Sequence, residues 1–432
     1  MDPLFVAVLI LCLALAFMAI GVSVALALML AGLAGLWIFR GNVDIASNVF
    51  FDSANSFTLT AVPLFILLGE ILVRCGAAET IYRGTSRLLS WAPGGLLHAN
   101  MASCALFAAI CGSSPATAAT IGTVAIPSLA SRGYEPRITL GSLAAGGTLG
   151  ILIPPSINMI IYGMIANASV GQLFAGGVVP GIIMTLTFMA YIAMRCMVDR
   201  GIAPREYGFT WRGAALGLFE LWPAAFLAVV VLGGIFWGIF TPTEAAAAGS
   251  FVALVIAVAI RGLTWRGLAT ALSNTVAISS MVLFIYVGAM VLASFFGVMG
   301  TPQAAAQQVL GSGGGKYTVL LIVFLIYIVL GCFLDGISMM VLTVPTVLPI
   351  LVALGFDPIW FGVALVILCE IGMITPPMGL NLFVIQGISG KPLAVVTWGV
   401  IPFFWLMLAN LALITAFPEL VLWLPRLLTA AG

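Results

Sequence analysis

Residues 150–158 read GILIPPSIN, and residues 372–381 read GMITPPMGLN. Each stretch places a double proline inside an otherwise apolar run. A proline pair removes two backbone donors, clashes with the preceding helical turn and disfavours helix at the residue before it. Each helix must therefore open at its prolines. The opening leaves free carbonyl groups on the first half-helix and a positive dipole end on the second.

The rest of the chain is strongly apolar. Of its 432 residues, 63% are hydrophobic and 7% are charged, with 15 Lys and Arg against 14 Asp and Glu. In a soluble domain about a quarter of the residues are charged, so the composition of this chain predicts an integral membrane protein. Long uninterrupted apolar runs favour helices over the short alternating strands of a membrane barrel. The balanced charge gives no indication of a nucleic-acid partner.

Charges, turn residues and Gly/Pro clusters divide the chain into an all-α bundle of about ten membrane-crossing helices. We expect them at residues 3–19, 21–39, 57–74, 138–165, 173–195, 216–239, 244–260, 276–297, 359–387 and 394–416. Two further apolar segments, 96–130 and 318–350, are too long for one span. GSSPAT at 112–117 and LDGIS at 334–338 interrupt them. Each segment is one long tilted span, two spans or a re-entrant hairpin.

The two halves of the chain repeat each other. A shift of 222 positions aligns their ordered prolines and glycines without a gap: Pro127 with Pro349, 133–136 with 355–358, Gly150 with Gly372, the two double prolines, and Pro180 with Pro402. This pattern predicts two domains, 1–215 and 216–432. Each contains scaffold helices, one interrupted segment (96–130 or 318–350) and one broken helix (138–165 or 359–387).

The distribution of basic residues tests the topology. If both interrupted segments are hairpins, each half has five crossings and the second half is inverted. With the N-terminus outside, twelve of the fifteen basic residues then lie on the cytoplasmic side, as expected for short loops. They are Arg74, Arg83, Arg87, Arg132, Arg137, Arg195, Arg200, Arg205, Arg212, Arg261, Arg266 and Lys391. The asymmetry therefore favours hairpins.

Inverted repeats with broken helices are typical of secondary transporters, which bind substrate and ions near the midplane. Among the tip residues, Asp335 is the strongest candidate, since a carboxylate at membrane depth is costly and usually serves an ion or proton pathway. Glu70, Glu244 and Glu370 are lesser candidates, and Glu244 could simply cap a helix. A single histidine and the absence of CxxC and HExxH motifs disfavour a membrane enzyme.

Five motifs together resemble one family, the DctM large membrane subunits of TRAP (tripartite ATP-independent periplasmic) transporters. They are VPLFILLGEI (62–71), CGSSPATAATIG (111–122), GTLGILIPPS (147–156), GIFTPTEAAA (238–247) and GMITPPMGLN (372–381). The resemblance covers essentially the whole chain. It implies an elevator-type importer in the bacterial inner membrane that uses Na⁺ as coupling ion and no organic cofactor. It also implies an organic-acid substrate such as a C4-dicarboxylate or sialic acid.

The resemblance further implies partners and site residues. The partners are a small four-helix membrane subunit of the DctQ type, a periplasmic substrate-binding protein of the DctP type, and membrane lipid. A stand-alone sodium:carboxylate symporter of related architecture is the alternative. The implied sodium-binding residues are Ser113, Ser114, Gly150, Pro155, Asp335, Gly372, Thr375 and Met378. The substrate is expected between them, at Thr117, Ser156, Asn158, Ser338 and Asn381.

Overall fold

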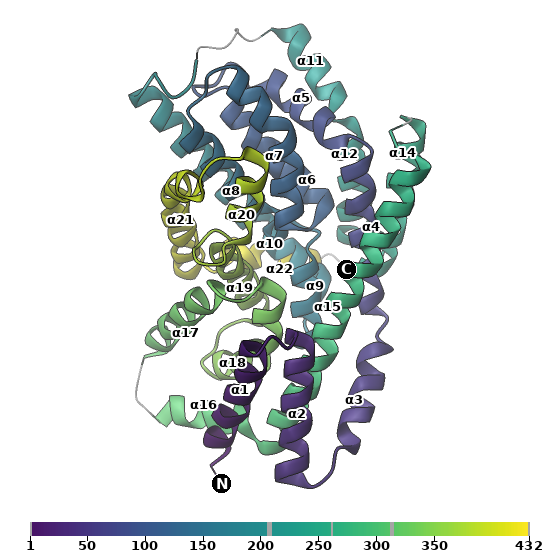
Figure 1. Cartoon of the computed structure of the whole chain (residues 1–432), viewed down its shortest axis with the longest axis vertical. Helices are drawn as coiled ribbons and strands as arrows, with labels where there is room; N and C mark the ends of the chain where they lie inside the picture. Colours follow the sequence, from purple (N-terminus) through teal and green to yellow (C-terminus); the bar gives the residue numbers. More distant parts are fainter. Residues whose placement is uncertain (1, 205–209, 261, 312–314, 431–432) are drawn as a thin grey trace.

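The computed structural model describes residues 2–204, 210–260, 262–311 and 315–430, and Figure 1 shows their course. Arg205 and Arg261, counted above on the cytoplasmic side, lie outside the described residues. Within these ranges the chain is helical and contains no strand, which confirms the predicted all-α class. The first half contains α1 (Pro3–Ala19), α2 (Val24–Arg40), α3 (Asp44–Ala54), the 3₁₀ turn η1 (Thr58–Thr60), α4 (Ala61–Arg74), α5 (Ala77–Leu89), α6 (Leu96–Cys111), α7 (Ser114–Ser131), α8 (Pro136–Leu152), α9 (Ile157–Ile165) and α10 (Val170–Val198).

The second half continues the same helical pattern. It contains α11 (Trp211–Glu220), α12 (Trp222–Ala228), the π-helical turn η2 (Val229–Gly233), α13 (Gly234–Phe236), α14 (Pro242–Ala259), α15 (Trp265–Met299), α16 (Thr301–Gly311), α17 (Lys316–Gly331), α18 (Gly336–Ala353), α19 (Pro358–Met373), α20 (Leu380–Ser389), α21 (Leu393–Ala416) and α22 (Glu419–Ala430).

Both double prolines open a helix, as the sequence predicts. The first separates α8 from α9 and bends the pair by 42°. The second separates α19 from α20. Both Pro–Pro peptide bonds are cis. Neither proline pair has backbone N–H groups to continue the helix, so α8 and α19 end before the prolines and α9 and α20 begin after them.

The two interrupted segments also break where expected. Gly112 adopts a left-handed conformation with φ of 66° and ends α6, and Pro115 stands in the first turn of α7. Proline is well suited to a helix start because that position needs no N–H donor. In the second half, α17 ends at Gly331 and Asp335 caps the start of α18.

Two helices form the centre of the packed core. The side chains of α8 are buried from Ile138 to Leu152, and those of α19 from Ile359 to Gly372. The helix pair α6 and α7 packs along α8, and α17 and α18 pack along α19. The half-helices are exchanged between the two sets, because α9 packs against α18 and α20 packs against α7. Figure 1 shows α8, α10, α19 and α20 together in the middle of the molecule.

Several helices are long and apolar enough to cross a membrane. Among the described residues, five qualify alone (α10, α14, α15, α18 and α21), and eight do if each of three bent pairs counts as one span. Six shorter apolar helices, of 10 to 17 residues, accompany them. The chain is therefore a multi-pass membrane protein.

Some details differ from the expected elements. The crossing expected at 216–239 corresponds to a bent pair of helices, with an angle of 48° between α11 and the segment that starts with α12. Pro223 lies in the first turn of α12 and cannot continue the hydrogen bonds of α11. Helices α3 and α16 were not predicted, since both are short and carry polar side chains. Helix α5 lies between the crossing expected at 57–74 and the first interrupted segment.

Candidate functional site

The first helical tip (residues 111–117) closes over the first break (residues 150–158). A methyl group on Gly150 would lie 2.6 Å from the carbonyl oxygen of Ser113 and 2.8 Å from Cα of Ser114. A methyl group on Gly112 would lie 2.8 Å from the carbonyl oxygen of Pro155. Only glycine permits such close backbone approach. The structure therefore brings together the four residues predicted for the first sodium site.

Ser114 joins this tip to the second half of the chain. Its Oγ donates a hydrogen bond to Oε2 of Glu370 at 3.2 Å and accepts one from Nδ2 of Asn381 at 2.9 Å. Asn381 also donates to the carbonyl oxygen of Ala144 at 3.1 Å. Both Ser114 and Asn381 are fully buried. The hydroxyl of Ser114 thus bonds to residues at both ends of the second break (residues 372–381): Glu370 lies just before it and Asn381 is its last residue.

Glu370 lies in the core of the molecule, with 1% of its surface exposed. Besides Ser114, its carboxylate accepts a hydrogen bond from the backbone N–H of Ile151 at 3.2 Å, through Oε1. A buried carboxylate is stable only when hydrogen-bond donors or opposite charges compensate its lost hydration. Here the two donors come from the first tip and from the end of α8. Glu370 therefore ties the tip and the first break to α19.

The second tip (residues 331–338) closes in a similar way over the second break (residues 372–381). A methyl group on Gly372 would lie 2.6 Å from the carbonyl oxygen of Gly331. The backbone N–H of Met378 donates to the carbonyl oxygen of Cys332 at 3.2 Å. Glycine again permits contact between a tip and the start of a break.

Asp335 acts as the N-cap of α18. Its Oδ2 accepts hydrogen bonds from the backbone N–H groups of Ile337 at 3.1 Å and Ser338 at 3.2 Å. Capping satisfies donors that a helix start leaves without partners. The side chain is half-buried, and both bonds use Oδ2. The carboxylate therefore lies at the tip, as predicted, with Oδ1 outside the two capping bonds.

Each break ends in an asparagine, and each asparagine lies against the tip of the other half of the chain. Asn381 of the second break reaches the first tip, as described above. Asn158 of the first break lies against the second tip, where a methyl group on Gly336 would be 2.7 Å from its Nδ2. The sequence did not predict this exchange, because the repeat alignment pairs equivalent positions of the two halves and does not say which residues are in contact.

The other predicted residues fulfil local roles. Thr117 donates to the carbonyl oxygen of Ser113 at 2.8 Å, and Thr375 to that of Ile371 at 2.6 Å. Ser156 caps α9 by accepting from the N–H of Met159. Among the described residues, Ser338 Oγ and Asn381 Oδ1 are buried without a hydrogen-bond partner. Such unsatisfied oxygens at a tip and a break are candidates for a cation ligand.

The two breaks differ in exposure. Pro154, Pro155 and Ser156 are buried, whereas Pro376, Pro377 and Met378 are exposed, the side chain of Met378 by 54%. The first break is therefore sealed by its tip and by the core, and the second break has one face on the surface.

Comparison with known proteins places this geometry in a family. The family model of the tripartite ATP-independent periplasmic transporter, DctM component, matches residues 11–420. The chain belongs to the DctM family. It is thus a transporter permease subunit and not an enzyme.

Two relatives and one solved structure are similar over most of the chain. The C4-dicarboxylate TRAP transporter large permease protein DctM of Vibrio cholerae is 35% identical over 405 residues, which cover 89% of each chain. The sialic acid TRAP transporter large permease protein SiaM of the same species is 32% identical and covers 90% of this chain and 91% of its own. The YdaH transporter of Alcanivorax borkumensis shares the fold, with a TM-score of 0.57 at 14% identity over 88% of this chain and 87% of its own.

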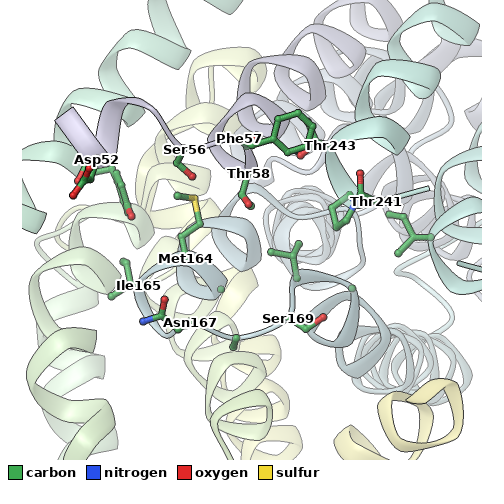
Figure 2. A pocket seen from close by; sticks show the side chains of 18 of the residues that line it. Asp52, Ser56, Phe57, Thr58, Met164, Ile165, Asn167, Ser169, Thr241 and Thr243 are labelled. Carbon is green, nitrogen blue, oxygen red and sulfur yellow. Dashed lines mark hydrogen bonds between the residues drawn. The ribbon is translucent and has the colours of Figure 1, made fainter. Parts of the chain in front are cut away.

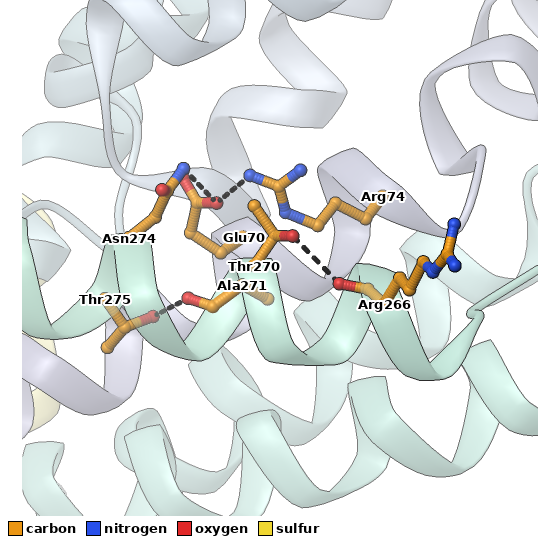
Figure 3. A network of polar contacts seen from close by, with 7 residues as sticks. All are labelled: Glu70, Arg74, Arg266, Thr270, Ala271, Asn274 and Thr275. Atoms are coloured by element: carbon orange, nitrogen blue, oxygen red, sulfur yellow. Dashed lines mark hydrogen bonds and ion pairs between the residues drawn. The ribbon is translucent and has the colours of Figure 1, made fainter.

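Of the three lesser acidic candidates in this DctM protein, two have simple structural partners. Glu70 on α4 pairs with Arg74 at 2.9 Å and accepts a hydrogen bond from Asn274 on α15 at 3.1 Å (Figure 3). Glu244 and Thr241 form a capping box at the start of α14, as the sequence suggested. Glu370 is the site residue that the sequence reasoning undervalued. The available signal was a lone acid within the apolar run 358–373.

A separate cavity of about 890 Å³ lies away from both breaks of the DctM protein and is shown in Figure 2. Its walls come from the segment before α4, the turn between α9 and α10, the start of α14, and α15. Labelled polar residues on these walls include Ser56, Thr58, Asn167, Ser169 and Thr241. None of the thirteen predicted site residues lines it.

Proposed function

We propose that this chain is the permease subunit of a sodium-coupled importer of an organic acid, acting by an elevator mechanism. The observation that carries the proposal is the pair of contacts between a helical tip and a double-proline break. A helix is interrupted at membrane depth only where other groups satisfy its freed backbone. Two such interruptions, each covered by a tip, match the construction of ion and substrate sites in secondary transporters.

The chemistry of both contacts suits sodium. Each break opens a helix end and frees carbonyl oxygens, which coordinate Na⁺ in broken-helix transporters. In the first contact, the amide of Asn381 reaches Ser114 through Nδ2, and its Oδ1 is one of the buried oxygens without a partner among the described residues. In the second contact, Ser338 Oγ lies in the first turn of α18. The second site would add the free Oδ1 of Asp335. We therefore assign one sodium site to each tip and break, with the residues predicted from the sequence.

An organic acid fits the space between these sites. Half-helices α9 and α20 both begin at a break, and helix N-termini favour negative charge. The first tip, the second tip and both breaks contain no Lys or Arg. Carboxylate recognition would therefore depend on the half-helix dipoles, on bound sodium and on the polar side chains of Thr117, Ser156, Asn158, Ser338 and Asn381. These groups suit a carboxylate in general, including the C4-dicarboxylates and sialic acids named for the two relatives.

The proposed architecture consists of two inverted repeats, 1–215 and 216–432. Each has five crossings and one re-entrant hairpin, formed by α6 with α7 and by α17 with α18. The mutual packing of α7 with α20, of α9 with α18 and of α8 with α19 supports a single transport body made from both halves. This body would slide against a scaffold that includes α2, α4, α14 and α15, which pack on one another.

The family description as a tripartite periplasmic system supports two partners. They are a small membrane subunit of the DctQ type and a periplasmic binding protein of the DctP type. A periplasmic partner requires that the permease lie in the bacterial inner membrane, with membrane lipid around its exposed apolar helices.

Uptake in proteoliposomes tests the proposal. The chain is reconstituted with its small membrane subunit, and its binding protein is added outside with radiolabelled C4-dicarboxylate or, separately, radiolabelled sialic acid. We expect uptake of one of the two only with an inward sodium gradient and only with the binding protein.

Two controls separate the alternatives. A potassium gradient of the same size should not drive uptake, and equal uptake with either ion would contradict sodium coupling. Equal uptake of free substrate without the binding protein would instead identify a stand-alone sodium:carboxylate symporter.

A further inference from the structure

The second break is attached at both ends to one hydroxyl group of the first tip. Glu370 precedes this break and accepts a hydrogen bond from Ser114 Oγ at 3.2 Å. Asn381 is the last residue of the break and donates to the same Oγ at 2.9 Å. The intervening residues contain the whole double-proline opening, including Gly372 and Met378. A backbone change that displaces either end of the second break would therefore move a partner of Ser114.

The orientation of the Ser114 hydroxyl follows from these two bonds. Its proton points to Glu370 and one lone pair receives the amide of Asn381, so that one lone pair remains. The opposing donor and acceptor fix the rotation of a group that would otherwise turn freely. The backbone of Ser114 lies at the contact between the first tip and Gly150, where its Cα would be 2.8 Å from a methyl group on that glycine.

We propose that Glu370 and Asn381 are positioning residues that couple the two sodium sites through Ser114. The inference rests on the proposed sodium coupling and adds to it the path of communication. Ion binding at the second break orders the segment between Glu370 and Asn381, which in turn orients Ser114 for the ion at the first break. The two ions then bind cooperatively, with a reciprocal effect of each on the affinity for the other.

Glu370 is suited to this role because both of its hydrogen-bond partners are donors and its carboxylate only accepts. The N–H of Ile151 and the hydroxyl of Ser114 each donate to one carboxylate oxygen. A glutamine of the same size has only one carbonyl oxygen, and its NH₂ group is itself a donor. Glu370→Gln therefore keeps the volume, but its NH₂ group cannot accept the Ser114 proton: the bond is either lost or reversed onto the lone pair that remained on Ser114.

Sodium binding to the purified chain tests the coupling without knowledge of the substrate. The full chain in lipid nanodiscs is titrated with ²²Na⁺ at constant ionic strength maintained with potassium. We expect a Hill coefficient above 1 for the unchanged chain. Glu370→Gln should lower the coefficient to about 1 and weaken half-saturation about fivefold, at the lower end of ordinary coupling between sites. Asn381→Leu, which removes both amide bonds at similar volume, should do the same.

Matched variants separate coupling from general damage. Glu70→Gln changes a carboxylate whose hydrogen-bond partners, Arg74 and Asn274, belong to neither tip. Asn410→Leu changes a buried amide that donates to the carbonyl oxygen of Leu406 within its own helix α21. Both should keep the Hill coefficient of the unchanged chain. The thermal midpoint of unfolding without sodium verifies that each variant is folded. If Glu370→Gln does not fold, the Hill coefficient of Asn381→Leu tests the coupling by itself.

The outcomes distinguish two failures. If the unchanged chain binds no sodium above the potassium background, the proposed sodium coupling is wrong. If it binds sodium with a Hill coefficient of 1, or if folded Glu370→Gln and Asn381→Leu keep its coefficient and half-saturation, sodium binding stands and the coupling through Ser114 is overturned.

Discussion

At the scale of single residues, two aspartates have the same local role as helix caps but different surroundings. Asp335 caps α18 and Asp357 caps α19, each with one carboxylate oxygen that accepts two backbone N–H groups. Capping alone therefore does not identify a functional carboxylate. Their positions differ, because Asp335 lies at a tip that contacts the second break, whereas Asp357 lies between α18 and α19, away from either break.

The substitutions Asp335→Asn and Asp357→Asn separate capping from ion binding. Asparagine caps helices about as well as aspartate, so we expect each variant to change the free energy of unfolding by less than about 0.5 kcal/mol. Only Asp335→Asn removes a charge from the proposed second sodium site. It should raise the sodium concentration for half-maximal uptake about tenfold, equivalent to about 1.4 kcal/mol.

The measurement is sodium-dependent uptake by the reconstituted complex, with the thermal midpoint as a check on folding. Equal half-saturation for Asp335→Asn and Asp357→Asn would remove Asp335 from the sodium site and leave it as a helix cap.

At the scale of elements, the sequence predicts local breaks well and long-range partners poorly. Proline pairs and tip glycines act through their own backbone, so the openings near Pro154 and Pro376 follow from the sequence alone. The bond between Ser114 and Glu370 joins residues 256 positions apart. The repeat could not reveal it, since the alignment places Thr148 opposite Glu370, and the Thr148 hydroxyl donates to Ala145 within α8.

The proposed hairpins make a prediction for labelling. Ser113 is partly exposed at the first tip and Phe333 is 61% exposed at the second. The parent chain carries Cys12→Ser and Cys332→Ser, which remove an exposed and a partly buried thiol. Because inverted hairpins enter from opposite faces, Ser113→Cys should react with a membrane-impermeant maleimide from the cytoplasmic side and Phe333→Cys from the periplasmic side.

Right-side-out and inside-out vesicles provide the two directions of access for this labelling, and the parent chain gives the background. Reaction of both cysteines from the same side only is incompatible with inverted hairpins.

For the whole molecule, the cavity in Figure 2 offers a test of relative motion. Ser56 belongs to the segment before α4, in the proposed scaffold, and Asn167 belongs to the turn after α9, in the proposed transport body. A sliding body must change the separation of these walls. A cross-link between Ser56→Cys and Asn167→Cys should therefore abolish most sodium-driven uptake.

Reversible bis-methanethiosulfonate reagents of graded length form this cross-link, and reduction should restore uptake. Each single cysteine treated with the same reagent is the control. Full uptake with the cross-link intact would exclude sliding of α9 against the segment before α4.

The exchange of the asparagines has a consequence for how the chain is made. Ser114 leaves the ribosome 267 residues before the Asn381 that completes its hydrogen bonds. The first tip therefore lacks its partners Glu370 and Asn381 until nearly the whole polypeptide has been inserted into the membrane. Despite its duplicated sequence, the protein cannot mature one half at a time, and a chain truncated before Asn381 would present an incomplete tip to the membrane quality-control proteases.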